Sequence, residues 1–327
     1  MNFTVRTRRA DNGVGLDPTV YVLEDGTGSV AEVWPALGFN CIRWLAARGE
    51  QTLDVLYSDP ALFQGGRPTR SGIPVLFPFP NRIREGRFVW EGKTYQLPLN
   101  DPVQKNAAHG FACRVPWRVV DSGADAGSAW VTGEFRCSVD APASLALWPA
   151  DHTLRLTLRL GMGTLRLEAE VHNPDSKTLP FGLGYHPYFR LGDGEESQVE
   201  VPAHEYWALE GNLPTGERVG VDPSRDLNAM RRVGDLHLDD VLTDLPPRPA
   251  RMDGLVERAA LRAASGNPMR LFCSPAFREM VVFTPPHREA FCVEPYTCTT
   301  DAVNIPEGGL LVLPPGQTWS AVVELWV

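Results

Sequence analysis

Residues 154–160 read LRLTLRL, a strict alternation of leucines with polar side chains. Successive side chains of a β-strand point to opposite faces, so this alternation predicts a half-buried strand whose leucines face the core. A second alternating run, LRLEAEV at residues 165–171, follows the short connection Gly161-Met162-Gly163-Thr164. The two runs are therefore predicted to form an antiparallel hairpin.

The charges along this predicted hairpin indicate how it is oriented. Pairing across the turn sets Arg155 opposite Glu170, which is favourable, and Arg159 opposite Arg166, which is not. We expect the end that carries the two arginines to face water.

Strand patterns of this kind dominate the chain, and helical periodicity is scarce. Asp59-Pro60 could open one short helical turn, and residues 223–232 form a second weak helix candidate. Many strands with few helices predict an all-β fold, a large antiparallel β-sandwich. No break in composition marks a linker, so residues 1–327 are expected to form a single domain. The further strand candidates are Thr19–Leu23, Ser29–Val33, Asn40–Leu45, Trp117–Val120, Trp130–Cys137, Met280–Phe283 and Trp319–Val327.

The overall composition excludes several classes of partner. The formal net charge of −9 argues against nucleic-acid binding and against an anionic membrane surface. Six cysteines occur without a C-x-x-C pair, which is typical of free thiols in a reducing compartment. The basic N-terminus leads into no apolar core, so we expect a cytoplasmic protein without a signal peptide. The oligomeric state, monomer or dimer, stays open.

The signatures of common cofactors and metals are missing from the sequence. Gly161-x-Gly163 lacks the third glycine of a dinucleotide loop, and there is no P-loop, H-E-x-x-H or G-x-S-x-G. The seven histidines are scattered along the chain. We therefore expect neither a cofactor nor a bound metal.

Four segments are dense in aromatic and polar residues, and they supply the candidate site residues. Each residue taken alone also has a structural interpretation. Glu294 could pair with an arginine, and His109 and His186 could hydrogen-bond at turns. Arg82 could form a surface ion pair, and the acidic pair Asp239-Asp240 could lie in a solvated loop. The segments are Ser71–Leu97, which contains Asn81 and Arg82, then His109-Gly110-Phe111, Gly182–Phe189 with His186, and Glu294–Asn304.

Taken together, the order and spacing of these segments resemble the aldose 1-epimerase (galactose mutarotase-like) family over about residues 20–327. Each motif alone is weak, but five in the same order are specific. The matching residues are Asn81-Arg82-Ile83, Gly86, Phe88, Gly92, Tyr95, Leu97, His109-Gly110, His186-x-Tyr188-Phe189 and Glu294-Pro295-x-Thr297.

The resemblance implies a large antiparallel β-sandwich and an isomerase that needs no cofactor. It implies that Glu294 is the general base and His186 the general acid. It implies substrate-binding roles for Arg82 and Asn81, with His109 near the anomeric carbon. Asp239 is the best match for a family aspartate that binds sugar hydroxyls, with Asp240 as the alternative. The chain departs from the galactose-acting branch at Phe111, at Phe79-Pro80 and at Asp240, which leaves the sugar open.

Mutarotation suits a carboxylate and an imidazole. The C1 hydroxyl of the sugar loses a proton while the ring oxygen gains one, so we expect an acid and a base on opposite sides of the breaking bond. A bell-shaped pH profile is expected, with an acidic limb from the carboxylate and a basic limb from the imidazolium. Three alternatives are a hexose-6-phosphate 1-epimerase, with Arg84 and Arg87 near the phosphate, a non-catalytic carbohydrate-binding protein, and a glycoside hydrolase. The hydrolase would need a second carboxylate.

Overall fold

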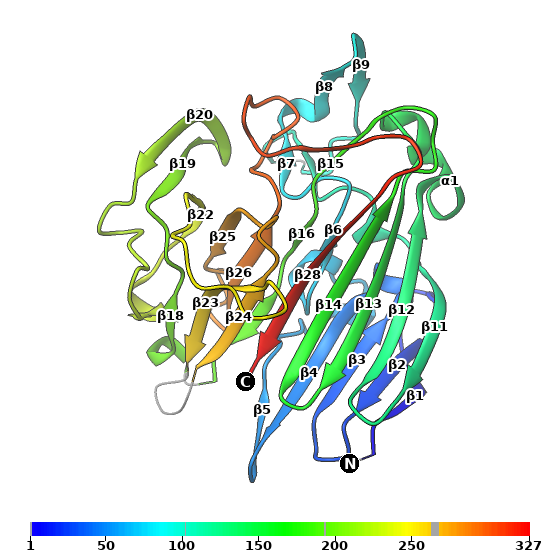
Figure 1. The fold of residues 1–327 in the computed structure, drawn as a ribbon, viewed down its shortest axis with the longest axis vertical. Coiled ribbons are helices and arrows are strands. Elements are labelled where there is room, and N and C mark those ends of the chain that lie inside the picture. Colours follow the sequence, from blue (N-terminus) through cyan, green and yellow to red (C-terminus); the bar gives the residue numbers. More distant parts are fainter. Residues whose placement is uncertain (1, 102, 193, 263–267) are drawn as a thin grey trace.

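The computed structural model describes residues 2–101, 103–192, 194–262 and 268–327. Antiparallel strands are the dominant regular structure of the described chain, and Figure 1 shows them gathered into large twisted sheets. The prediction of an all-β sandwich is confirmed. Among the described residues, no helix is long and apolar enough to span a membrane.

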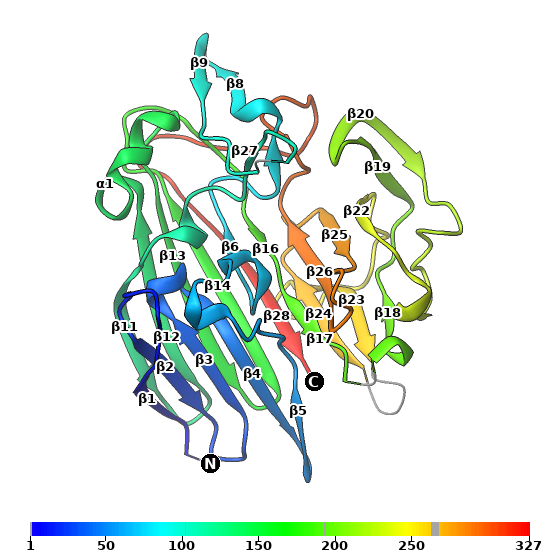
Figure 2. The ribbon, with the colours of Figure 1, turned by 180° about the vertical axis from the view of Figure 1, so that it is seen from behind.

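Two of the large sheets pack face to face. In both ribbon views the N-terminal sheet lies across the β11–β14 part of the longest sheet (Figures 1 and 2). Among the described residues, the N-terminal sheet has the order β1(Thr4–Arg9)-β2(Thr19–Glu24)-β3(Val30–Trp34)-β4(Asn40–Arg48)-β5(Gln51–Asp54). The longest sheet has the order β11(Arg118–Ala124)-β12(Ala129–Arg136)-β13(Thr153–Gly161)-β14(Thr164–His172)-β28(Thr318–Trp326)-β24(Met269–Cys273)-β23(Val256–Arg262)-β18(Gln198–Glu200)-β21(Arg231–Arg232).

A third large sheet carries most of the predicted site residues. Its order is β20(Leu213–Gly220)-β19(Glu205–Glu210)-β22(Asp239–Thr243)-β25(Glu279–Phe283)-β26(Ala290–Tyr296)-β16(Gly184–Tyr185)-β6(Val75–Leu76), and β17(Tyr188–Arg190) also pairs with β26. Three small two-stranded pairs complete the strands: β7(Arg82–Ile83) with β10(Ala107–Ala108), β8(Arg87–Trp90) with β9(Lys93–Gln96), and β15(Leu179–Phe181) with β27(Leu311–Leu313).

The predicted hairpin of residues 154–171 is confirmed as β13 and β14. Arg155 pairs with Glu170 and Arg159 pairs with Arg166, in the predicted register. The two arginines are tolerated because Glu168 lies 3.7 Å from Arg159 and 2.9 Å from Arg166. Their side chains are 31% and 23% exposed, so this end of the hairpin is only partly in water. The other seven predicted strands correspond to β2, β3, β4, β11, β12, β25 and β28, with ends shifted by up to four residues.

One of the two helix candidates is confirmed and the other is wrong. Asp59 opens a short turn: its side chain accepts a hydrogen bond from the Ala61 amide, its carbonyl accepts one from the Leu62 amide, and the 3-10 turn Leu62–Gln64 follows. Residues 223–230 form turns and bends before β21 and no helix. The Asp222 and Asp226 side chains accept hydrogen bonds from the backbone amides of Ser224 and Asn228, which favours local turns over a helix.

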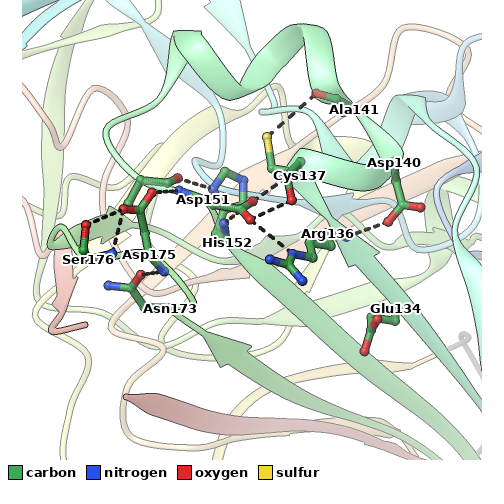
Figure 3. Close-up of polar contacts among 12 residues, drawn as sticks. Glu134, Arg136, Cys137, Asp140, Ala141, Asp151, His152, Asn173, Asp175 and Ser176 are labelled. Carbon is green, nitrogen blue, oxygen red and sulfur yellow. Dashed lines mark hydrogen bonds and ion pairs between the residues drawn. The ribbon is translucent and has the colours of Figure 1, made fainter. Parts of the chain in front are cut away.

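Short helical segments otherwise sit at the ends of strands. The helix α1(Cys137–Asp140) follows β12 and is tied down by Asp151, whose carboxylate accepts hydrogen bonds from Ser138 and Arg136 (Figure 3). The remaining segments are 3-10 turns at Pro35–Leu37, Pro68–Arg70, Arg84–Gly86, Ala112–Arg114, Pro142–Leu147, Gly194–Glu196 and Val233–Asp235.

One extensive apolar core joins the sheets. Its buried residues include Trp44 of β4, Leu156 of β13 and Phe291 of β26. All six cysteines are buried free thiols, as the sequence predicted. This core holds the backbone of β26 and β16 in place, and both strands contribute to the site described next.

Candidate active site

A cavity of about 480 Å³ opens beside the sheet that contains β25 and β26. The structure brings all six predicted site residues to its wall, although they come from separate parts of the chain. They are Asn81, Arg82, His109, His186, Asp239 and Glu294.

Glu294 lies on β26 and is 2% exposed. Its Oε2 accepts a hydrogen bond of 2.6 Å from the Tyr296 hydroxyl, and both side chains are on the same face of the strand because they are two residues apart. Burial raises the pKa of Glu294 well above its usual value, and the hydrogen bond from Tyr296 opposes this only in part. The hydrogen bond therefore holds the carboxyl group in place through Oε2, and Oε1 takes no part in it.

His186 lies in the short connection between β16 and β17. Its ring stacks on Tyr188 with the centroids 4.7 Å apart, and the Tyr188 hydroxyl in turn donates to the Thr69 carbonyl. Nδ1 of His186 lies 3.3 Å from Glu294 Oε1, but it is buried and has no hydrogen-bond partner among the described residues. Burial lowers the pKa of His186 to about 3, so the neutral imidazole is favoured.

Asn81 and His109 are fixed by an unusual backbone. Both have positive φ angles, 53° and 64°, and the His109 amide donates to the Asn81 carbonyl at 2.7 Å. The next residue, Gly110, also has a positive φ, and a Cβ there would lie 2.2 Å from the Phe77 carbonyl oxygen. Only glycine fits at this position, which explains the His-Gly pair in the sequence.

Arg82 does form an ion pair, but it lies at the cavity wall and is largely buried. Its Nε lies 3.0 Å from Asp101 Oδ2, and its Nη1 donates to Asn81 Oδ1 at 2.9 Å. The side chain is 20% exposed. These two contacts fix the plane of the guanidinium at the cavity wall.

The structure distinguishes the two adjacent aspartates of β22. Asp239 lines the cavity, and its Oδ2 accepts a hydrogen bond of 3.0 Å from Asn212. Burial raises the pKa of Asp239, and the nearby Arg82 opposes this rise. Asp240 is not part of the cavity wall; its carboxylate binds Arg225 at 2.8 Å.

Several aromatic side chains line the cavity without a role predicted from the sequence, among them Tyr57, His287 and Tyr296. Tyr57 and His287 stack with their ring centroids 4.5 Å apart, and both line the cavity. Tyr296 could have been found from its two-residue spacing to Glu294 on a strand. No local pattern indicates Tyr57 or His287, because their proximity depends on chain segments that meet only in the folded protein.

Arg84 and Arg87, the residues considered for a phosphate group, do not line the cavity. Arg84 instead lies 3.6 Å from Asp301 and donates to the Pro214 carbonyl. Arg70 does line the cavity, and it has no ion-pair partner in the described part of the chain.

Comparison with known proteins places the chain in a family. Residues 19–326 match the family model described as Aldose 1-epimerase. The uncharacterized protein YphB of Escherichia coli (strain K12) is 28% identical over 258 residues, which is 77% of this chain and 82% of YphB.

Solved structures share the fold. A galactose mutarotase-like protein from Clostridium acetobutylicum superimposes with a TM-score of 0.84 at 21% identity, covering 99% of this chain and 98% of that one. Galactose 1-epimerase from Lactobacillus acidophilus NCFM gives a TM-score of 0.78 at 18% identity, with the same coverage of both chains. Since the family model spans nearly all of its length, this chain belongs to the aldose 1-epimerase family.

Proposed function

We propose that this protein is a mutarotase that interconverts the α and β anomers of a free hexose or a related sugar. The observation that carries the proposal is the buried pair of Glu294 and His186, 3.3 Å apart at the wall of a cavity lined by hydrogen-bonding side chains. The carboxyl and imidazole groups are the two groups that general acid–base ring opening requires.

In the proposed reaction one member of the pair removes the proton from the C1 hydroxyl while the other gives a proton to the ring oxygen. The bond from C1 to the ring oxygen breaks, and the open aldehyde rotates about C1–C2. Closure on the other face uses the same two groups in reversed roles. Arg82, Asn81, Asp239 and His109 hold the hydroxyl groups, and Tyr57 and His287 offer an aromatic wall to the apolar face of the sugar.

From the sequence we expect the acid and the base on opposite sides of the breaking bond, whereas the proposed reaction has them approach from one side. Glu294 and His186 are neighbours. Both reacting oxygens are bonded to the same carbon, so two adjacent groups can reach them from one side.

The experiment that tests the proposal is a screen of anomer exchange by NMR or polarimetry over free and phosphorylated sugars, with the uncatalysed rate subtracted. Catalysed exchange of at least one free sugar supports it. Saturable sugar binding without faster exchange would instead identify a carbohydrate-binding protein. A preference for glucose 6-phosphate over glucose would point to Arg70, which lines the cavity, as the residue that binds the phosphate.

Arg82→Ala is expected to raise KM roughly tenfold to hundredfold with a smaller change in kcat. The guanidinium is proposed to bind a hydroxyl that does not react, and a charged hydrogen bond contributes about 1.5–3 kcal/mol. Steady-state anomer exchange gives both constants. Arg84→Ala is the matched control, because Arg84 is two residues away and outside the cavity wall. A collapse of kcat with KM unchanged would show that Arg82 acts in the transition state.

The pH profile of kcat/KM is expected to be a bell with its acidic limb near pH 3 and its basic limb well above the usual range of a carboxyl group. In the active form, Glu294 and His186 together carry one proton. Burial lowers the pKa of His186 to about 3 and raises that of Glu294, so the second proton is added only in acid and the last one is lost well above the usual range of a carboxyl group. The acidic limb therefore belongs to the imidazole and the basic limb to the carboxyl group, the reverse of the sequence-based expectation. Initial rates of anomer exchange, extrapolated to zero buffer concentration at each pH, measure this profile. A narrow bell limited by pKa values of about 4.3 and 6.5 would contradict it.

A further inference from the structure

Three side chains that can bind a metal ion converge at the buried end of the proposed catalytic pair. They are His186, Cys292 and Glu294, and one ligand atom from each lies within 4.8 Å of the other two. The three residues are 7%, 0% and 2% exposed. The cysteine has no part in the proposed reaction, so its position beside the pair calls for a separate explanation.

The sheet produces this convergence. Cys292 and Glu294 are two residues apart on β26, which places both side chains on one face of the strand. Tyr188 of β17 is the register partner of Cys292, and the connection before β17 carries His186 over the same face. The cluster therefore rests on paired strands within the core and not on a loose loop.

The three groups have free lone pairs. Nδ1 of His186 is buried without a partner among the described residues. Tyr296 occupies only Oε2 of Glu294, which leaves Oε1 on the side of His186. A point among three atoms no more than 4.8 Å apart lies within about 2.8 Å of each, against usual zinc bond lengths of about 2.0–2.3 Å. Shifts of less than about 1 Å would therefore close the site around an ion.

We propose that His186, Cys292 and Glu294 form an inhibitory zinc site. A thiolate, an imidazole and a carboxylate are the ligands that Zn²⁺ prefers, and three of them leave a fourth position for water from the cavity. Binding displaces the protons of the thiol and carboxyl groups into solvent. The ion then occupies the groups that would exchange protons with the sugar. The inhibition rests on the proposed function, whereas the metal binding does not.

Metal binding is tested first, without any sugar. The chain is stripped with a chelator, dialysed and titrated with Co²⁺, which replaces Zn²⁺ and gives a charge-transfer absorption when a cysteine thiolate is a ligand. We expect one equivalent to produce this band, and Zn²⁺ to abolish it. Cys292→Ser should lose the band and bind Zn²⁺ roughly a hundredfold more weakly, since even changes outside the ligand set cost 10–100-fold. The control is Cys273→Ser, at a buried cysteine of β24. It should keep the cobalt band and the zinc affinity of the wild type.

Anomer exchange is then followed at increasing Zn²⁺. The wild-type chain should lose activity and regain it with EDTA, and Cys292→Ser should need roughly a hundredfold more zinc relative to its own zinc-free rate. Cys292→Ala repeats the comparison if the serine variant is unstable. Equal inhibition of both chains, a cobalt spectrum without the thiolate band, or activation by zinc overturns the proposal. If no sugar is turned over, the proposed function fails and the cobalt titration still decides the metal site.

Discussion

Replacing Glu294 by Gln is expected to lower kcat by roughly a hundredfold to ten-thousandfold, the usual contribution of a positioned acid or base. The amide keeps the size of the carboxyl group and can still accept the hydrogen bond that Tyr296 donates at 2.6 Å. It cannot take up or release a proton near neutral pH. The loss should therefore appear in kcat, with KM little changed, in anomer exchange corrected for the uncatalysed rate.

The matched control is Glu279→Gln. Glu279 is also a buried glutamate of the same sheet, on the neighbouring strand β25, and it accepts a hydrogen bond from the Trp207 indole. It is not part of the cavity wall, and burial raises its pKa to about 7. We expect this variant to keep kcat within a few-fold of the wild type once folding is verified. Near-normal kcat in folded Glu294→Gln would show that Glu294 is not a member of the catalytic acid–base pair.

His186→Asn is expected to cause a loss of the same order, roughly a hundredfold to ten-thousandfold in kcat. Asparagine keeps a hydrogen-bonding group above Tyr188 but cannot exchange a proton. Glu294 and His186 act as a unit in the proposed reaction, so the double variant should lose much less than the product of the two single losses. Fully multiplicative losses would show that the two residues act independently.

The control for this change is His152→Asn. His152 is fully buried, and its Nδ1 lies 3.0 Å from the Ala150 carbonyl, within the network drawn in Figure 3. It does not line the cavity, so its replacement should lower thermal stability and leave kcat nearly unchanged below the melting temperature. A similar loss of kcat in both histidine variants would attribute the effect to general destabilisation.

Local pattern predicted the strands well because strand periodicity is a property of adjacent residues. The leucine alternation at residues 154–160 fixed both the buried face of β13 and its register with β14. The same reasoning failed at residues 223–232, where aspartate side chains bind backbone amides and form turns instead of the expected helix.

The sequence by itself determined the fold class and, through its motif order, the family and a set of six candidate residues. Only the tertiary structure decided how these residues meet. It placed Asp239 at the cavity and Asp240 on Arg225, and it brought Glu294 next to His186 and Tyr57 next to His287. The physical reason is that strand alternation depends on near neighbours along the chain. Contacts between distant strands, and the burial that shifts the pKa values of Glu294 and His186, exist only after the sheets have packed.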